Sequence, residues 1–447
     1  MASVLSYSLP GKRRLPPGPP LPSLAQTLAC GVRPLPVLDW CRSRYGAQFT
    51  MYPVDMPPLV FLSAWQDIRS VVTAAPSTLH PGAGAAMLTP IVGESSCMLR
   101  DEEEHLPGRC VASRGFRRDA LRTHAHLVAD LVEREIHTWP CDVPFPLHPR
   151  LRSLTLNVAM RTVFADDTPR LQELHAMILQ MLSITGGPTL FAPRLRHLPG
   201  WRRPWKRFLR QRHEVEQRLQ AVITHARRKD TRSESILDLL LQAHDSDGAP
   251  MSDQQIHAHL MSVLLAGHET TASQLAWAFQ LLAHDPRVQN RLIDEIDADT
   301  NSSEYLSATV SEVLRHRPVF LFTIPRVVVT PIQIGAWTYK PPVQLLGCIY
   351  LMHHDPELYP NPHSFNPERF LENPPRAETW LPWGGGRKRC PGSHLATLEI
   401  EAVLKATLSA RTVAPAAGAR MEHARWRSVI VTPHAGSRVT LHKRRRP

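Results

Sequence analysis

The sequence predicts a mainly helical fold with a small β lobe, an α+β class, on three observations. Helix-favouring patterns dominate residues 116–163. A second run, apolar and free of proline, covers residues 256–282 and is long enough for a buried central helix. Residues 48–52 and 60–63 read as short strands. With 43% hydrophobic and 21% charged residues, the 447-residue chain has an ordinary globular composition and can bury a large core.

The chain begins with a proline-rich lead-in, predicted over residues 1–20. Its first residues hold no apolar run long enough for a signal peptide or a bilayer-spanning helix, so no transmembrane anchor is expected. Residues 202–229 have the arginine-rich pattern of a long surface helix. Ser252 and Gln255 have the spacing of a capping box and predict the start of the central helix.

The loop from Trp383 to Gly392 carries the strongest chemical signal. Its glycines let the backbone turn tightly and approach a flat ligand. The cations of residues 387–389 favour the thiolate form of Cys390 by lowering its pKa. Pro391 suits the first turn of a following helix. A thiolate in an open, positive loop is what a haem iron needs from a cysteine ligand, whereas the alternative is an ordinary free cysteine in a glycine loop.

The central helix contains an unusual cluster around Gly267. Glycine in a helix interior costs about 1 kcal/mol and threonine is a mediocre helix former, so a compensating role is expected. Ala266 and Thr270 are four residues apart and share one helical face, where small side chains would admit a flat cofactor. The Thr270 hydroxyl can bond to a backbone carbonyl and open the helix locally. The alternative is a core helix in which Glu269 simply faces solvent.

The Cys390 loop resembles the haem-binding segment of cytochromes P-450, the haem-thiolate monooxygenases. Trp383, Gly386, Cys390 and Gly392 fit that pattern. Trp383 stands where phenylalanine is usual, which keeps a large aromatic beside the sulfur. Lys388 stands where arginine is usual, which keeps a cation for a haem propionate but loses the bidentate fork.

The resemblance implies a role for each part of the site. Cys390 would be the axial ligand of the haem iron, and Glu269 with Thr270 would relay protons to iron-bound dioxygen. His105 and Arg109, with a His-x-x-x-Arg spacing, would bind a propionate. The full set expected to bind the cofactor is His105, Arg109, Ala266, Gly267, Arg326, Trp383, Gly384, Lys388 and Cys390.

Three further residues match the family's structural ion-pair network. Glu312 and Arg315 are three apart and share a helical face. By resemblance, Arg369 completes a buried triad with them and holds the loop on the haem side in place. The resemblance also places a flexible loop over the substrate at residues 75–96 and a substrate pocket at Val319, Phe320 and Phe322.

The resemblance implies one haem-thiolate monooxygenase domain over residues 21–447, with haem b as cofactor and O2 as oxidant. Electrons from NAD(P)H would arrive through a separate ferredoxin or flavodoxin and its reductase. The substrate would be an apolar small molecule of secondary, lipid or terpenoid metabolism, and the reaction would be hydroxylation of a C–H bond or epoxidation. The enzyme would be a monomer. The alternatives are a peroxygenase or dehydratase of the same fold and a non-catalytic haem sensor or electron carrier. A small helix common in relatives is expected to be missing between residues 296 and 305.

Net charge and cysteine content indicate which partners and which cellular compartment to expect. The net charge of +12 is scattered and accompanies no nucleic-acid-binding motif, so no nucleic-acid partner is expected. The basic residues 387–389 would instead steer an acidic electron donor. The odd number of cysteines, seven, and the need for a free thiolate predict a reducing compartment, the cytoplasm. A proline hinge with no anchor helix before it is typical of a soluble, bacterial member.

Overall fold

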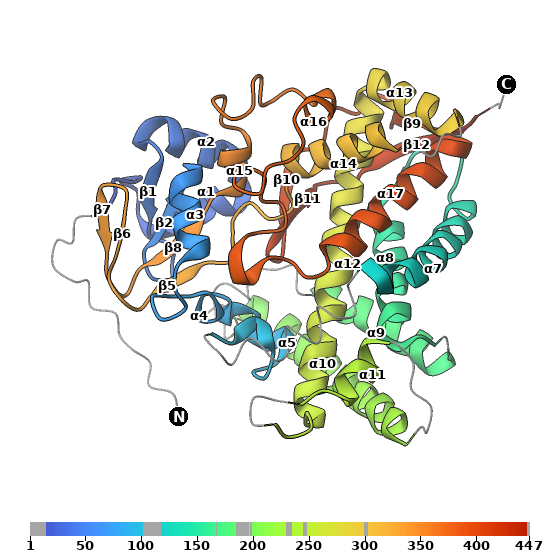
Figure 1. The fold of residues 1–447 in the computed structure, drawn as a ribbon, viewed down its shortest axis with the longest axis horizontal. Helices are drawn as coiled ribbons and strands as arrows, with labels where there is room; N and C mark the ends of the chain where they lie inside the picture. Colours follow the sequence, from blue (N-terminus) through green and yellow to red (C-terminus); the bar gives the residue numbers. More distant parts are fainter. Residues whose placement is uncertain are drawn as a thin grey trace.

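The structure is a computed structural model that describes residues 15–101, 118–166, 168–184, 196, 199–228, 235–244, 248–298 and 303–444. Helices fill one side of the molecule and a small sheet lies on the other (Figure 1). The largest hydrophobic core lies among the helices, and two smaller clusters pack against the sheet. This arrangement confirms the predicted α+β class with its small β lobe.

The α-helices have the following bounds: α1 Ser23–Val32, α2 Pro34–Tyr45, α3 Trp65–Thr73, α4 Pro81–Gly84, α5 Thr89–Val92, α7 Arg118–His137, α8 His148–Phe164, α9 Pro169–Ile184, α10 Pro199–Arg227, α11 Ile236–Leu241, α12 Asp253–His284, α13 Pro286–Asp297, α14 Glu304–His316, α15 Ile349–His353, α16 Glu368–Glu372 and α17 Ser393–Ala410. Short 3-10 turns cover η1 Ala86–Leu88, η2 Cys97–Leu99 and η6 Gly386–Lys388. The strands are β1 Gln48–Met51, β2 Leu59–Leu62, β3 Leu79–His80, β4 Phe145–Pro146, β5 Arg326–Val328, β6 Ile332–Ile334, β7 Trp337–Tyr339, β8 Gln344–Gly347, β9 Arg411–Pro415, β10 Ala424–Arg427, β11 Ile430–Pro433 and β12 Arg438–Lys443.

Helix α12 runs through the middle of the molecule (Figure 1). Its start is the capping box that the sequence predicts: Gln255 N–H donates to Ser252 Oγ at 3.2 Å, and Ser252 N–H donates to Gln255 Oε1 at 2.8 Å. Two of the four unpaired N–H groups at the helix start are thereby satisfied. At the other end, Asp285 accepts from Val288 N–H and starts α13. Helix α8 packs along α12 and brings its own side chains to the middle of that helix.

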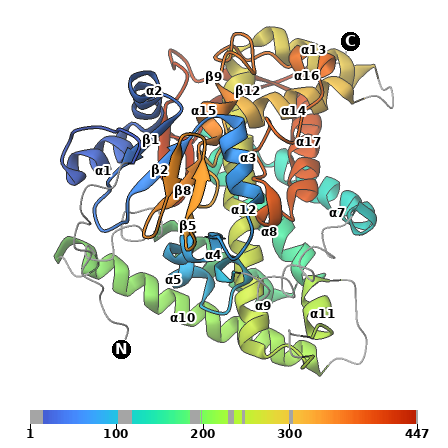
Figure 2. The same cartoon turned by 60° about the vertical axis from the view of Figure 1, so that its left-hand side comes forward.

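The main sheet has the strand order β1-β2-β8-β5-β3. Strand β2 pairs with β1 in antiparallel register, Gln48 opposite Leu62, and with β8 in parallel register, Leu59 opposite Gln344. Helix α3 packs against β8, beside the strands in Figure 2. The sheet therefore joins the first hundred residues to a segment near residue 345, and α3 lies between the sheet and the loop that carries Cys390.

Residues 75–96 differ from the loop that the resemblance implies, because they contain β3, α4, η1 and α5. Pro81 lies in the first turn of α4, where its missing N–H and fixed φ are favourable. The Asp101 carboxylate accepts from Gly82 N–H at 2.6 Å and Ala83 N–H at 2.9 Å, which satisfies the start of this short helix. A Cβ on Gly84 would lie 1.7 Å from the Pro325 carbonyl oxygen, so the segment packs directly on the chain next to Arg326.

Within the described residues, no helix combines the length and the apolar character needed to cross a bilayer.

Candidate functional site

The cysteine loop is held tightly by its backbone. Cys390 N–H donates to the Trp383 carbonyl at 2.8 Å and closes the loop on itself. Gly384 and Gly386 have φ of +66° and +63°, in the left-handed region that glycine adopts without strain. A Cβ on Gly386 would lie 1.9 Å from the carbonyl oxygen of Val72 at the end of α3, so glycine is required there for packing as well.

The Cys390 side chain is exposed, unlike the other cysteines that the structure describes. Burial raises the pKa of Cys41 to about 11 and that of Cys30 to about 12, so both stay protonated and chemically inert. Helix α17 begins at Ser393, just after Cys390. The partial positive charge of a helix N-terminus therefore adjoins the sulfur and favours a thiolate. Among the cysteines that the structure describes, Cys390 is therefore the most exposed to solvent.

Two cations of the predicted cofactor set have different hydrogen-bond partners in the structure. Lys388 Nζ donates to the carbonyls of Arg100 at 2.8 Å and Cys97 at 3.3 Å, and so ties the loop to η2. Arg326 is buried, forms no ion pair with any described residue, and donates to its own neighbour, the Ile324 carbonyl, at 3.1 Å. Burial lowers the pKa of Arg326 to about 10.

A buried guanidinium without a carboxylate is costly, and an anionic ligand would satisfy it. The donor set therefore fits a haem, whose iron takes a thiolate and whose propionates take cations. His105 and Arg109, predicted for the same propionates, lie outside the described residues.

The middle of α12 presents small residues beside a hydroxyl. Thr270 Oγ1 donates to the Ala266 carbonyl at 2.7 Å, the local bond that the sequence predicts. Ala266 is exposed and Gly267 is partly exposed. A Cβ on Gly267 would touch only Ala159 on α8, at 3.5 Å. This turn of α12 therefore offers a surface of small side chains next to the Thr270 hydroxyl.

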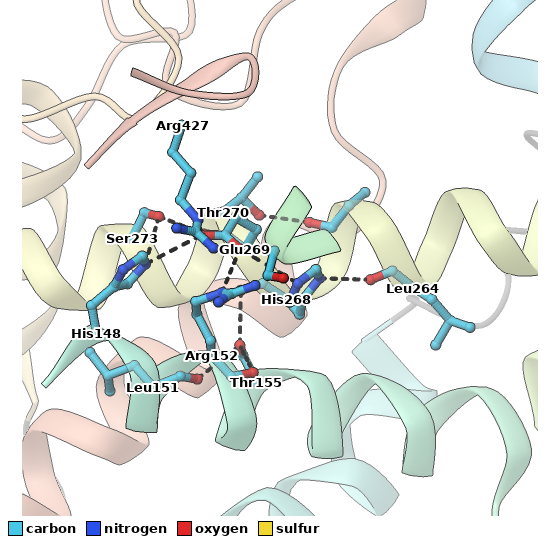
Figure 3. Close-up of polar contacts among 12 residues, drawn as sticks. His148, Leu151, Arg152, Thr155, Leu264, His268, Glu269, Thr270, Ser273 and Arg427 are labelled. Atoms are coloured by element: carbon cyan, nitrogen blue, oxygen red, sulfur yellow. Dashed lines mark hydrogen bonds and ion pairs between the residues drawn. The ribbon is translucent and has the colours of Figure 1, made fainter. Parts of the chain in front are cut away.

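Glu269 points away from solvent into an ion-pair cluster (Figure 3). Its Oε2 lies 2.6 Å from Arg152 Nε on α8, and its Oε1 lies 2.6 Å from Arg427 Nε on β10. His148 Nε2 lies 3.4 Å from Oε1. Burial alone would raise the pKa of Glu269, but the charges of Arg152 and Arg427 outweigh it and leave that pKa below its usual value. The carboxylate is therefore ionised at neutral pH.

The two histidines beside Glu269 are neutral at pH 7. Burial, opposed only in part by the Glu269 charge, lowers the pKa of His148 and of His268 to about 4. His148 Nε2 lies 3.2 Å from Ser273 Oγ, and Thr155 Oγ1 donates to the His268 carbonyl at 2.8 Å. Two guanidinium groups thus neutralise the carboxylate while two uncharged rings fill the space around it.

The expected structural triad comes together in the fold. Arg315 donates from Nε and Nη2 to the two oxygens of Glu312, at 2.7 and 2.8 Å. Arg369 Nε lies 3.2 Å from Glu312 Oε2. Asn366 N–H also donates to the same carboxylate, at 2.9 Å, so the triad fixes the chain between α15 and α16.

The three residues expected to line the substrate pocket differ in burial. Val319 is buried in a hydrophobic cluster, and its carbonyl accepts from Val431 N–H at 2.9 Å. Phe322 is partly buried and lies edge-on to Phe61, with ring centroids 5.1 Å apart. Phe320 alone of the three is exposed.

Sequence reasoning missed Arg152, Arg427 and His148. Arg152 and Arg427 are separated from Glu269 by more than a hundred residues, and periodicity carries no information about such contacts. The one available signal was an arginine among the apolar positions of residues 148–164, since a charge there needs a partner.

The fold belongs to a class already known from solved structures. The solved structure described as "Retinoic acid bound cyanobacterial CYP120A1" superposes with a TM-score of 0.82 and 23% identity, covering 96% of this chain and 99% of that one. At this identity the likeness establishes the fold alone.

The family follows from sequence. The family model described as Cytochrome P450 matches residues 16–440. A relative named "Putative cytochrome P450 135B1" from Mycobacterium bovis is 32% identical over 96% of this chain and 91% of its own length. Another, "Putative cytochrome P450 135A1" from Mycobacterium tuberculosis, is 31% identical over 100% of this chain and 98% of its own. The chain therefore belongs to the cytochrome P450 family, whose members are haem-dependent monooxygenases, and the predicted family is confirmed.

Proposed function

We propose that this protein inserts one oxygen atom of O2 into an apolar small molecule, by C–H hydroxylation or epoxidation. The observation that carries the proposal is the exposed Cys390 thiol in its glycine loop, beside the start of α17. The buried guanidinium of Arg326, which forms no ion pair with a described residue, supports it from a different element. Family membership supplies the reaction class.

Haem b is the cofactor in this proposal. Cys390 would ligate the iron, and Arg326, Lys388, His105 and Arg109 would surround the propionates. Trp383 and Gly384 would line the sulfur side, while Ala266 and Gly267 would face the porphyrin from α12. When bound, the haem supplies a redox-active iron whose electronics are set by the cysteine sulfur.

The protein's own part in the chemistry is proton handling on α12. Thr270 Oγ1 holds its proton toward the Ala266 carbonyl and can pass it on when that bond opens. Glu269 stores a negative charge between Arg152 and Arg427. Arg427 is the more solvent-exposed of these two partners, so its withdrawal would free Oε1 to take a proton from solvent and deliver it toward Thr270.

Electrons would come from NAD(P)H through a separate ferredoxin or flavodoxin and its reductase. Arg387 and Arg389 are exposed beside Cys390 and would guide an acidic donor to that face. The apolar substrate class is supported by the exposed Phe320. Retinoic acid, which is bound in the related cyanobacterial structure, is itself a largely apolar molecule. We propose a cytoplasmic monomer.

Replacement of the sulfur tests the cofactor assignment. Cys390→Ser should abolish the red-shifted Soret band that the reduced carbon monoxide complex shows under thiolate ligation, because the axial ligand sets the electronics of the haem. Cys97→Ser, at a partly buried cysteine, is the matched control and should keep the band. If Cys390→Ser keeps the band, another residue is the ligand.

Reaction stoichiometry separates this proposal from its alternatives. With a surrogate ferredoxin and reductase, a monooxygenase consumes NAD(P)H and O2 in step with product. A peroxygenase or dehydratase needs neither, and a haem sensor forms no product.

Glu269→Gln should lower product formed per NAD(P)H consumed and raise the solvent isotope effect, since it removes the ionisable proton carrier. An unchanged ratio in this variant would exclude Glu269 from proton delivery.

A further inference from the structure

The ion-pair cluster around Glu269 holds more positive than negative charge. Arg152 and Arg427 each contribute a positive charge, and the Glu269 carboxylate contributes the negative charge that they share. His148 and His268 are neutral at pH 7, so they do not change this balance. Among the described residues, no other aspartate or glutamate forms an ion pair with either arginine. The cluster therefore keeps one positive charge without a counter-ion.

This excess charge lies where water compensates it poorly. The side chains of Arg152 and Glu269 are each 13% exposed, and that of Arg427 is 28% exposed. Arg152 Nη2 is buried and has no hydrogen-bond partner. A largely buried charge that lacks a counter-ion is costly, and a bound anion offsets that cost. The cluster is therefore expected to bind one further negative charge.

Arg427 is the member of the cluster that an incoming anion would meet. It is the more exposed of the two arginines, and Figure 3 shows it on the opposite side of α12 from Arg152. Among the described residues, Glu269 is the one with which Arg427 forms an ion pair. A guanidinium has five N–H donors and a carboxylate takes two of them in a fork, so donors remain on Arg427 for a second anion.

The hairpin that carries Arg427 lies beside the segment expected to line the substrate pocket. Strand β11, the partner of β10, packs on α12. Val431 N–H on β11 donates to the Val319 carbonyl at 2.9 Å, and the Trp426 ring centroid lies 6.3 Å from that of Phe322. The hairpin therefore joins the charged cluster on α12 to the apolar and aromatic residues 319–322.

We propose that the substrate is an apolar molecule that carries a single carboxylate, and that Arg427 binds this carboxylate. This assignment rests on the proposed function, because it names the substrate class of the same site. The substrate carboxylate accepts from the guanidinium, and the apolar body extends toward residues 319–322. Because Arg427 is then shared, its hold on Glu269 weakens when substrate binds, and the carboxylate that handles protons is released only in the presence of substrate.

Other ligands satisfy the cluster less well. A neutral molecule leaves the positive charge without a counter-ion. A phosphate monoester carries nearly two negative charges at pH 7, and the second would be repelled by ionised Glu269. Inorganic phosphate or chloride shares the chemistry of an anion but has no apolar body to contact residues 319–322. A carboxylic acid with an apolar body provides one negative charge and the apolar contact together.

Binding to the full-length haem-loaded protein tests this assignment. The probes are decanoic, phenylbutanoic and adamantaneacetic acids, each compared with its primary amide at pH 7.5, where the acids are ionised and the amides have nearly the same shape. Dissociation constants come from calorimetry and from the shift of the Soret band. We expect at least one acid to bind about tenfold or more tightly than its amide, because a charge-assisted bond is lost in the amide. Arg427→Gln should bring that pair to within about twofold of each other.

Arg287→Gln is the matched control, since it removes an arginine from a pair of similar length at the surface, 2.7 Å from Glu368. It should keep the preference for the acid. The substrate assignment is wrong if no acid binds more tightly than its amide, or if Arg427→Gln keeps the preference. It is also wrong if inorganic phosphate binds as tightly as the acids.

The comparison of acid with amide on the unaltered protein needs no variant, so it decides the matter even if Arg427→Gln fails to hold haem. A failure of the proposed function looks different. A protein that gives the thiolate Soret band and forms product from a neutral substrate, but shows no preference for acids, refutes only the substrate class. A protein in which Cys390→Ser keeps the band refutes the proposed function whatever acids it binds.

Discussion

The buried triad gives a prediction that separates buried from surface ion pairs. Glu312 and Arg315 are fully buried, and Glu312 carries the negative charge shared by Arg315 and Arg369. In Glu312→Ala, Arg315 would keep only the carbonyls of His353 at 2.7 Å and Ser364 at 3.3 Å as acceptors. Its positive charge would then be buried without a counter-charge.

Breaking such a pair by removing one partner costs about 3–5 kcal/mol, because the remaining charge cannot return to water. The surface pair of Arg287 with Glu368 provides the contrast. Its N···O distance is also 2.7 Å, but Arg287 is largely exposed and solvent screens the pair. Arg287→Ala should therefore cost less than about 1 kcal/mol. The Glu312–Arg315 and Arg287–Glu368 pairs have equal N···O lengths and differ in burial, and Glu312→Ala also removes the contacts with Arg369 and Asn366.

The assay is urea unfolding of the haem-loaded protein followed by far-ultraviolet circular dichroism, with the free energies of unfolding compared. Glu312→Gln is a useful intermediate, since it keeps the shape and one acceptor oxygen but removes the charge. We expect its cost to fall between those of the other two variants. If Glu312→Ala costs no more than Arg287→Ala, burial of the triad contributes nothing and the reasoning fails.

Three further predictions concern the loop, acid stability and the tie to η2. Gly386→Ala should sharply reduce the haem content per chain, because its Cβ would lie 1.9 Å from the Val72 carbonyl oxygen. Gly384→Ala, whose Cβ would meet no atom nearer than 3.9 Å, should cost only about 1–2 kcal/mol of backbone strain. Equal haem content in the two variants would contradict this prediction. Burial lowers the pKa of His259 from 6.5 to about 4 in the folded protein. As the pH falls between these values, the unfolded chain binds a proton at His259 before the folded chain does. The free energy of unfolding therefore decreases by about 1.4 kcal/mol per pH unit in this range. His259→Gln should make the dependence of the free energy of unfolding on pH less steep in this range, and an identical slope in the variant and the unaltered protein would refute the assignment. Lys388→Met removes the donor to the Arg100 carbonyl and should raise amide hydrogen exchange in residues 97–100, with unchanged exchange the contrary result.

The chemistry-bearing loop and the central helix could be predicted from sequence because their signals are local. The glycines, cations and proline around Cys390 lie within ten residues of one another, and the Ser252 capping box sets the start of α12 from four residues. The Glu312–Arg315 pair follows from helical spacing, and its partner Arg369 from the family pattern.

The surroundings of Glu269 could not be predicted in the same way. Its partners come from α8 and β10, and which arginine reaches it depends on how those elements pack on α12. Helix α4, within residues 75–96, likewise has its first N–H groups satisfied by the Asp101 carboxylate from outside the segment. In both places the polar partner lies outside the local segment, so the sequence of that segment does not reveal it.

The parallel pairing of β2 with β8 has a consequence for biosynthesis. Strand β2 emerges from the ribosome with β1 as a neighbour, but its other edge has no partner until residues 344–347 are made. At a translation rate of about 5–20 residues per second, that edge of Leu59–Leu62 waits on the order of 15–60 seconds. An apolar strand with an open edge is a target for misassembly during this interval. Early binding of a chaperone to residues 48–62 of the nascent chain would protect it.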